Sequence, residues 1–256
     1  ETYNIKELNF KIGGDLEEKD INAFTYIEYN DSLILVSSGS GILKGRLEND
    51  ATFSIQKFKD ENGDQVGGHF MYQTIVDSEG TVWGSTWRNY FKKYYVENGN
   101  LVEQEVVSKN GLLGMTAFVR SVYEDSQKNI WLPNSNGLYK LSETQSMISV
   151  FPPAHLKGCD DQTYSIYGIT EDSGGHLWVS SPYNLYRFDK DDILENRCPT
   201  NYLHFTDPQF HLARDLFIDS ANRLWVSGQN GLSISQLDEN NEPGPCLLYT
   251  SPSPRD

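Results

Sequence analysis

Apolar and polar positions alternate along this chain in short runs that are bounded by turn residues. The pattern is clearest between Gly168 and Asp189. It predicts a strand over residues 168–171, a tight turn over residues 172–176, a strand centred on Trp178, and a third strand that follows a second turn. Such a succession is typical of an antiparallel meander built from two hairpins.

The same pattern recurs at a nearly constant interval. An Asp-Ser pair begins six residues before each of four tryptophans, which lie 48, 47 and 47 residues apart: Trp83, Trp131, Trp178 and Trp225. A degenerate copy lies 48 residues before the first of them, where Leu35 takes the place of the tryptophan. A period near 47 with about four short strands in each unit is typical of the blades of a β-propeller.

We therefore predict an all-β fold, a β-propeller fragment of about five four-stranded blades within residues 1–245. Repeats are expected near residues 21–60, 69–107, 116–151, 163–206 and 211–237. The fourth strands are fainter, and we expect them at residues 147–151, 202–205 and 102–107. Seven blades of this length would need roughly 330 residues, so we expect an incomplete seven-bladed ring with exposed blade edges.

The last eleven residues, Cys246 to Asp256, depart from the repeat and read CLLYTSPSPRD. They resemble a translated sequencing-library adapter, and we expect a non-native tail at residues 246–256 that lies outside the fold. With no initiator Met at its start, the chain is expected to be an internal piece of a longer protein.

Composition excludes several classes of partner. The formal charge is −15 and the pI is near 4.7, with no basic run, which argues against nucleic acid and anionic membrane surfaces. No apolar run approaches the ~18 residues that cross a bilayer, so membrane attachment would need segments outside this chain. The five histidines show no paired ligand spacing, and we expect no metal and no cofactor. Cys159 and Cys198 fall in loops on opposite faces of a propeller, so we predict free thiols.

The repeated residues themselves have a functional and a structural interpretation. The tryptophans could form stacking platforms, but each lies mid-strand among apolar neighbours, which favours the core. Glu171 and Asp172 could suggest paired catalytic carboxylates, yet adjacent residues of a strand point to opposite faces. The Asp is expected to accept backbone N–H groups of its own turn, and we assign no catalytic residue.

The copies VRSVYEDSQKNIWLPNSNGLYKL and GITEDSGGHLWVSSPYNLYRFD closely resemble the two-component regulator propeller repeat. The resemblance implies the extracytoplasmic, periplasmic sensor region of a membrane-anchored bacterial receptor. In that family the output is often a histidine kinase and sometimes a diguanylate cyclase, neither of which this fragment contains. The resemblance further implies a small-molecule or oligosaccharide ligand and a homodimer of the complete receptor.

Candidate ligand residues are those that the fold would place beside the central channel. Five lie in turns between second and third strands: Trp87, Arg88, Asn134, Tyr183 and Gln229. Four others stand five residues before each repeat Asp: Tyr72, Arg120, Tyr167 and Arg214. Alternating Arg and Tyr would suit hydroxyl-rich or acidic sugars. The alternative is that Arg120 and Arg214 pair with neighbouring carboxylates.

Two other functions remain open from the sequence. A propeller glycosidase or lyase is suggested because the stretch from Asp77 to Trp83 resembles the Asp-box turn, and Asp215 is a carboxylate on a first strand away from the turns. A protein-binding scaffold of the WD type is less favoured, because the combined Gly-His and Trp-Asp signature of that repeat is absent: no Trp-Asp pair occurs.

The core assignment of the tryptophans is testable by truncation. Trp178→Ala should lower the free energy of unfolding by ~3–5 kcal/mol, because the indole is replaced by a cavity. The measurement is a denaturation curve of a protein with complete blades. An unchanged melting temperature would contradict the assignment.

Overall fold

The computed structural model describes residues 9–14, 16–17, 23–30, 33–49, 52–60, 62–68, 70–86, 91–104, 119–134, 137–141, 148–151, 166–181, 184–191, 201–204, 213–228, 231–245 and 247–249. The chain divides into two compact units, residues 1–122 and 123–256. Each unit is built from small β-sheets in which consecutive strands are neighbours, except that β1 lies beside β5. No helix among these residues is long and apolar enough to cross a membrane.

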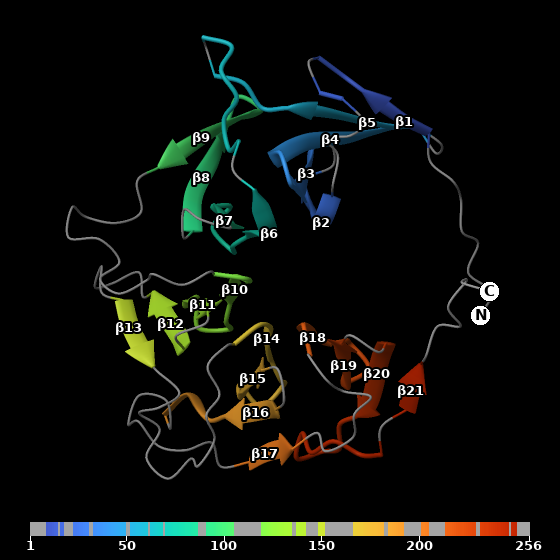
Figure 1. The fold of residues 1–256 in the computed structure, drawn as a ribbon. Helices are drawn as coiled ribbons and strands as arrows, with labels where there is room; N and C mark the ends of the chain where they lie inside the picture. Colours follow the sequence, from blue (N-terminus) through green and yellow to red (C-terminus); the bar gives the residue numbers. More distant parts are fainter. Residues whose placement is uncertain are drawn as a thin grey trace. The chain divides into compact units, whose positions relative to one another are not determined.

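The first unit contains two sheets (Figure 1). One has five strands in the order β1-β5-β4-β3-β2: β1 (Asn9–Ile12), β2 (Ala23–Asn30), β3 (Leu33–Ser38), β4 (Gly41–Asn49) and β5 (Thr52–Lys57). The other has four strands: β6 (Met71–Val76), β7 (Val82–Thr86), β8 (Phe91–Glu97) and β9 (Asn100–Gln104). All pairings are antiparallel except that of β1, which runs parallel to β5.

The second unit contains three antiparallel four-stranded sheets. The first is β10 (Tyr123–Glu124), β11 (Ile130–Asn134), β12 (Gly137–Leu141) and β13 (Ile148–Phe151). The next is β14 (Ile169–Glu171), β15 (Leu177–Ser180), β16 (Asn184–Phe188) and β17 (Asn201–His204). The last is β18 (Asp215–Ile218), β19 (Arg223–Gly228), β20 (Gly231–Gln236) and β21 (Leu247–Tyr249).

These five sheets confirm the predicted all-β class. The faint fourth strands are also found, as β13, β17 and β9, each within a few residues of the expected range. Two features differ from expectation. The first sheet gains β1, which lies outside every repeat, and β21 draws Leu247–Tyr249 of the expected tail into the last sheet. Leu-Leu-Tyr carries enough strand preference to pair with β20 although the residues around it break the repeat.

Each repeat turn is organised by its aspartate. In the turn at Asp172 the carboxylate Oδ1 accepts the backbone N–H groups of Gly174 and His176, at 2.9 and 3.0 Å. Oδ2 accepts the indole N–H of Trp178 at 2.9 Å. The turns at Asp77, Asp125 and Asp219 repeat both arrangements with their own tryptophans. The prediction that the Asp caps its own turn is confirmed.

Glu171, of the Glu171–Asp172 pair, joins neighbouring sheets. The Glu171 carboxylate accepts the backbone N–H and the hydroxyl of Ser126, which belongs to the preceding repeat, at 2.6 and 2.7 Å. Lys190 donates to Glu171 at 2.7 Å and lies 3.1 Å from the Asp125 carboxylate. These contacts tie the β10–β13 sheet to the β14–β17 sheet.

The core of the second unit forms where the tryptophan face of one sheet meets the opposite face of the next. Trp131 packs with Ile169, Leu177 and Val179 of the following sheet, and Trp178 is in a cluster with side chains of β18 and β19. Both indoles are 1% exposed, which confirms their assignment to the core. Trp225 is half-buried, because it lies on the face of the last sheet that turns away from that cluster, beside the exposed Phe217.

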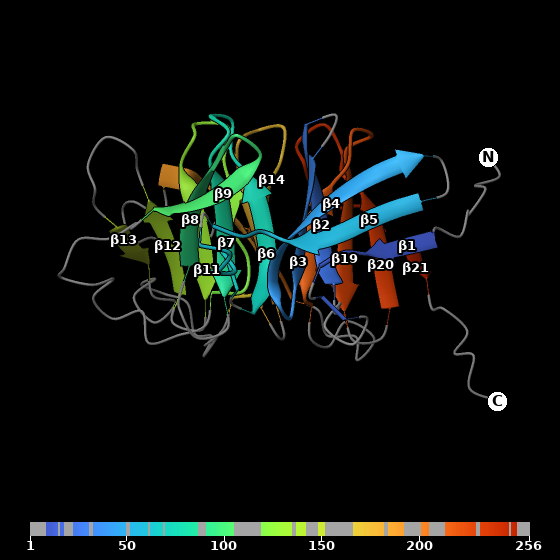
Figure 2. The ribbon, with the colours of Figure 1, turned by 90° about the horizontal axis from the view of Figure 1, so that it is seen from above.

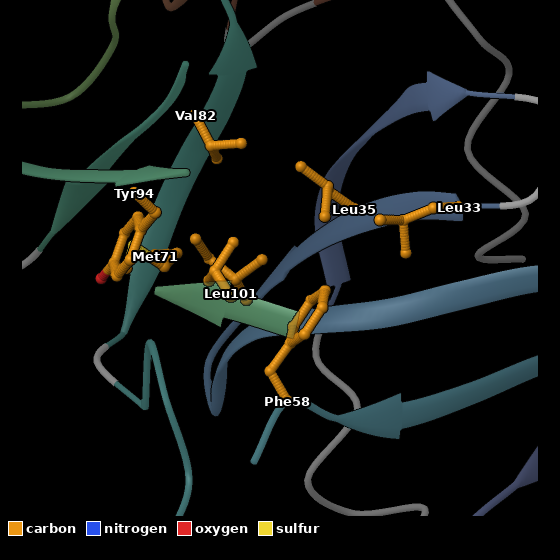
Figure 3. Close-up of a cluster of buried hydrophobic side chains, with 8 residues drawn as sticks. Leu33, Leu35, Phe58, Met71, Val82, Tyr94 and Leu101 are labelled. Atoms are coloured by element: carbon orange, nitrogen blue, oxygen red, sulfur yellow. The ribbon is translucent and has the colours of Figure 1, made fainter. Parts of the chain in front are cut away.

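The core of the first unit follows the same rule. Leu35 replaces the tryptophan and packs with Met71, Val82 and Tyr94 of the second sheet, as Figure 3 shows. Phe58, just beyond β5, closes this cluster. Burial raises the pKa of the Tyr94 hydroxyl strongly, and that hydroxyl has no hydrogen-bond partner in the described part of the unit.

The buried turn carboxylates are held in their ionised form. Burial alone would raise the pKa of Asp172, but the hydrogen bonds from the Trp178 indole and the His176 backbone outweigh it and lower the pKa. Asp125 is lowered in the same way, by Trp131 and Asn129. Each charge therefore stabilises the folded state wherever the carboxylate is ionised.

We expect Asp172→Asn to destabilise the protein by about 1–3 kcal/mol at neutral pH, because an Asn amide cannot accept every one of these hydrogen bonds. The folded pKa of Asp172 lies below the unfolded value of about 3.9, so its stabilisation is present above that pH and is lost as the pH falls below it. The variant should therefore lose less stability than the parent between about pH 4 and pH 2. Urea unfolding at several pH values measures this, with the exposed Asp191→Asn as control. Parallel pH profiles of parent and variant would contradict the assignment.

Candidate functional site

The four residues predicted near the starts of first strands come together in two pairs. The guanidinium of Arg120 lies 5.9 Å from the ring centre of Tyr72 in the first unit. The guanidinium of Arg214 lies 5.6 Å from the ring centre of Tyr167 in the second. In both pairs an Arg contacts the Tyr that occupies the same position one repeat earlier. The sequence identified all four positions but not this pairing.

In the second unit the pair lies where two first strands run side by side, β14 and β18 (Figure 1). Tyr167 donates its backbone N–H to Ser180 at 2.9 Å, and Arg214 donates its own to Ser227 at 2.7 Å. The Ser180 hydroxyl accepts the backbone N–H of Gly168 at 3.0 Å. The backbone on both sides is therefore fixed, while the Arg214 side chain is exposed at the surface.

In the first unit Tyr72 is part of a larger aromatic surface. The exposed Phe70 meets its ring edge-on at 5.4 Å, and Arg120 stacks on it. Below this surface the Ser85 hydroxyl donates to the backbone carbonyl of Arg120 at 3.2 Å, and the Gln73 side chain accepts the backbone N–H of Val122 at 2.7 Å. These bonds attach the start of the third repeat to the second sheet.

Asp215 adds a carboxyl group next to Arg214. Desolvation by the surrounding protein raises its pKa, and the hydrogen bond from the Leu216 backbone opposes this only in part. The side chain keeps contact with solvent. Adjacent residues of a strand point to opposite faces, so the set able to bind a polar ligand with a flat apolar face is the Arg214 cation and the Tyr167 ring.

The other candidate residues belong to the second-to-third-strand turns. Trp87, Arg88, Tyr183 and Gln229 lie outside the described residues. Asn134 is the last residue of β11, and only its backbone is described. Their role in binding stays a prediction, as does the state of Cys159 and Cys198, which also lie outside the described residues.

Sequence reasoning missed a cation opposite the tryptophan on the third strand. Lys93, Lys140 and Arg187 pair across the ladder with Trp83, Trp131 and Trp178, and each places its charge within 5.2–5.8 Å of the ring centre. The sequence signal for this contact is a Lys or Arg nine or ten residues after the Trp. The spacing can be interpreted as a cross-strand contact only when the register of the hairpin is known.

Within the described residues there is no group of His, Cys, Asp and Glu side chains that could hold a metal ion. The two Arg–Tyr pairs are the predicted ligand residues whose side-chain contacts the structure describes.

No family model matches the chain, and no curated protein is detectably similar to it in sequence. Its structure, however, is similar to known propeller proteins. The extracellular domain of BT3049 of B. thetaiotaomicron, assigned as a hybrid two-component system, aligns with a TM-score of 0.65 at 14% identity, over 93% of this chain and 30% of that one. The extracellular domain of BT4673 of the same organism gives 0.61 at 17%, over 86% and 28%.

An enzyme is also among the similar structures. Virginiamycin B lyase of Staphylococcus aureus aligns with a TM-score of 0.61 at 14% identity, over 92% of this chain and 72% of that one. At such identities the similarity establishes the fold: the chain is built from β-propeller blades. It spans less than a third of the length of the two extracellular domains.

The close approach of strands at the second pair gives a steric test. A Cβ added at Gly168 would lie 2.9 Å from the Asp215 Cα and 3.0 Å from the Leu216 backbone N, neither of which can move alone. Gly168→Ala should therefore destabilise the protein by about 1–3 kcal/mol, measured by urea unfolding. Gly13→Ala is the control, because its nearest atom would lie 3.6 Å away. Equal stability of both variants would show that β14 and β18 are not this close.

Proposed function

We propose that this chain is the ligand-binding part of an extracytoplasmic sensor region, and that the Arg–Tyr pairs contact the ligand. The observation that carries the proposal is the recurrence of one stacked pair in both units, at the same repeat positions. In the four repeats that have a tryptophan, the turn Asp and the Trp provide the framework, and the pairs use other residues.

The chemistry of the pair indicates the ligand class. A Tyr ring offers a flat apolar face, against which a sugar ring can stack, and a guanidinium offers several N–H donors to hydroxyl or carboxylate oxygens. In the second unit the exposed Arg214 makes no ion pair with any described carboxylate, unlike Arg187 and Arg223. The alternative, pairing with neighbouring carboxylates, thus has no support at Arg214. An oligosaccharide ligand fits this chemistry best.

The cellular setting is proposed from the repeat and the fold together. The spaced residues resemble the two-component regulator propeller repeat, and similar structures include extracellular domains assigned to two-component systems. We propose a periplasmic location, a membrane anchor and output domain in segments outside this chain, and a homodimer of the complete receptor. Detection of a histidine kinase or cyclase domain in the same reading frame would test this setting.

A catalytic role has one supporting observation. Asp215 has a raised pKa, as a general acid would require, and lyase and lactonase propellers share the fold. Its described neighbours Arg214 and Tyr167 supply a cation and a ring but no second carboxylate or His. We therefore favour binding without turnover. Release of products from the oligosaccharides used below would favour the enzyme.

The binding test uses the full chain and short oligosaccharides, both neutral (cellohexaose, xylohexaose) and acidic (trigalacturonate), in isothermal titration. Arg214→Ala and Tyr167→Ala should each weaken binding of the preferred sugar about tenfold, since each removes a hydrogen-bonding or stacking group.

The matched control is Arg223→Ala. Arg223 also stacks on a ring, that of Trp225 at 5.3 Å, but it lies at the opposite end of the same sheet. Its loss should leave affinity unchanged. Saturable binding that none of the variants weakens would contradict the assignment of the site, and no binding of any sugar would contradict the proposed ligand class.

A further inference from the structure

A cleft lies in the first unit, and none of the Arg–Tyr residues lines it. It has a volume of about 650 Å³ and is enclosed by β1, β4 and β5, the last residue of β2 and the first of β3, and the β8–β9 hairpin. Its charged lining residues are Lys11, Lys44, Arg46 and Glu48. Three cations against one carboxylate is an unusual local balance in a chain whose formal charge is −15.

The cations gather there because β1, β4 and β5 each present a polar and an apolar face. Along β4 the residues 44, 46 and 48 share one face, and Leu43 and Leu47 share the other. Figures 1 and 2 show β1 beside β5 at the outer edge of this sheet, and the register pairs Lys11 with Ser54, which itself pairs with Arg46. Lys11, Arg46 and Ser54 therefore lie on one face.

The opposite face explains why this arrangement is stable. Leu43, Ile55 and Val36 are buried there with Leu16, and Ile12 of β1 packs against them. The added strand β1 thus covers apolar surface with one face while it extends the polar face with the other. Sequence analysis did not predict β1, and for that reason it did not predict the cleft.

Lys44 anchors the inner wall of the cleft. Its Nζ donates to the backbone carbonyl of Gly99 in the β8–β9 hairpin at 3.0 Å and lies 5.9 Å from the Phe58 ring centre. One of its three N–H groups is used in this way, so the half-buried ammonium group has donors left for a ligand. The hairpin thereby holds one cation in a fixed place.

Arg46 supplies the unpaired charge. No described carboxylate forms an ion pair with it, whereas Glu48 lies 3.6 Å from Lys11 and balances that cation. Ser54 and Gln56 provide neutral hydrogen-bonding groups beside it. A planar guanidinium with free donors, next to a fixed ammonium group, matches the geometry of an oxyanion.

We propose that this cleft binds an oxyanion, namely a carboxylate, sulfate or phosphate group carried by a small hydroxylated molecule. Arg46 and Lys44 contact the anionic group, and Gln56 and Ser54 contact the hydroxyl groups. The site is independent of the Arg–Tyr pairs and would be a second input to the same protein.

The test is isothermal titration of the full chain with inorganic phosphate, inorganic sulfate, glucuronate and neutral glucose. We expect saturable binding of at least one anion and none of glucose, and about tenfold weaker binding for Arg46→Gln and for Lys44→Gln. Preference for glucuronate identifies a carboxylate on a sugar, and preference for an inorganic ion identifies that group. Lys57→Gln is the matched control, because residue 57 follows Gln56 on β5 and points to the other face.

Circular dichroism and thermal unfolding establish that each variant is folded, and Arg46, being exposed, should not affect folding. The proposal is overturned if no anion binds, if Arg46→Gln binds as the parent does, or if Lys57→Gln weakens binding equally. Arg214→Ala should leave anion binding at this cleft intact, so failure here is distinguishable from failure of the proposed oligosaccharide site.

Discussion

The structure depends on one hydrogen-bonded carboxylate, the turn aspartate, which fixes both a turn and an indole. One oxygen accepts two backbone N–H groups of the turn, and the other accepts the Trp N–H six residues along, at 2.7–2.9 Å in all four repeats. The backbone part of this turn also occurs at Asp60 and Asp238, which have no tryptophan. The turn is therefore an independent local structure, and the tryptophan is attached to it.

This carboxylate also determines how neighbouring sheets pack, because it orients the indole. An indole held by its N–H presents its ring to one face of the sheet, where the next sheet covers it. The cation across the ladder lies on the same ring, and Arg187 also reaches the Asp172 carboxylate at 3.2 Å. A buried carboxylate would be costly alone. Here the turn N–H groups, the indole and the cation together compensate its desolvation, which is why the charge can be retained in the core.

The fold was predictable from sequence because the arrangement of Asp, turn and Trp is local in the chain. Asp, turn and Trp lie within seven residues, so their recurrence is visible as a period. The sequence predicted the positions of the site residues but not their contacts. Tyr167 and Arg214 are 47 residues apart and meet only because the strands β14 and β18 are neighbours. Strand β1 was missed because it belongs to no repeat, and β21 was missed because the residues around Leu247–Tyr249 are unlike a blade.

In this acidic chain, the cations that stabilise the fold are paired with carboxylates, and the cations proposed to bind ligands are not. Lys190 and Arg187 lie against the turn carboxylates that hold the sheets together, and their charge is matched inside the protein. Arg214 directly precedes β18 and Arg46 lies within β4, both away from those turns, and no described carboxylate pairs with either. A guanidinium without an ion-pair partner costs little folding free energy where solvent reaches it, so it is tolerated although it does not stabilise the fold. Its free donors are then available for a ligand, which is why the two proposed sites lie outside the repeated residues that specify the fold.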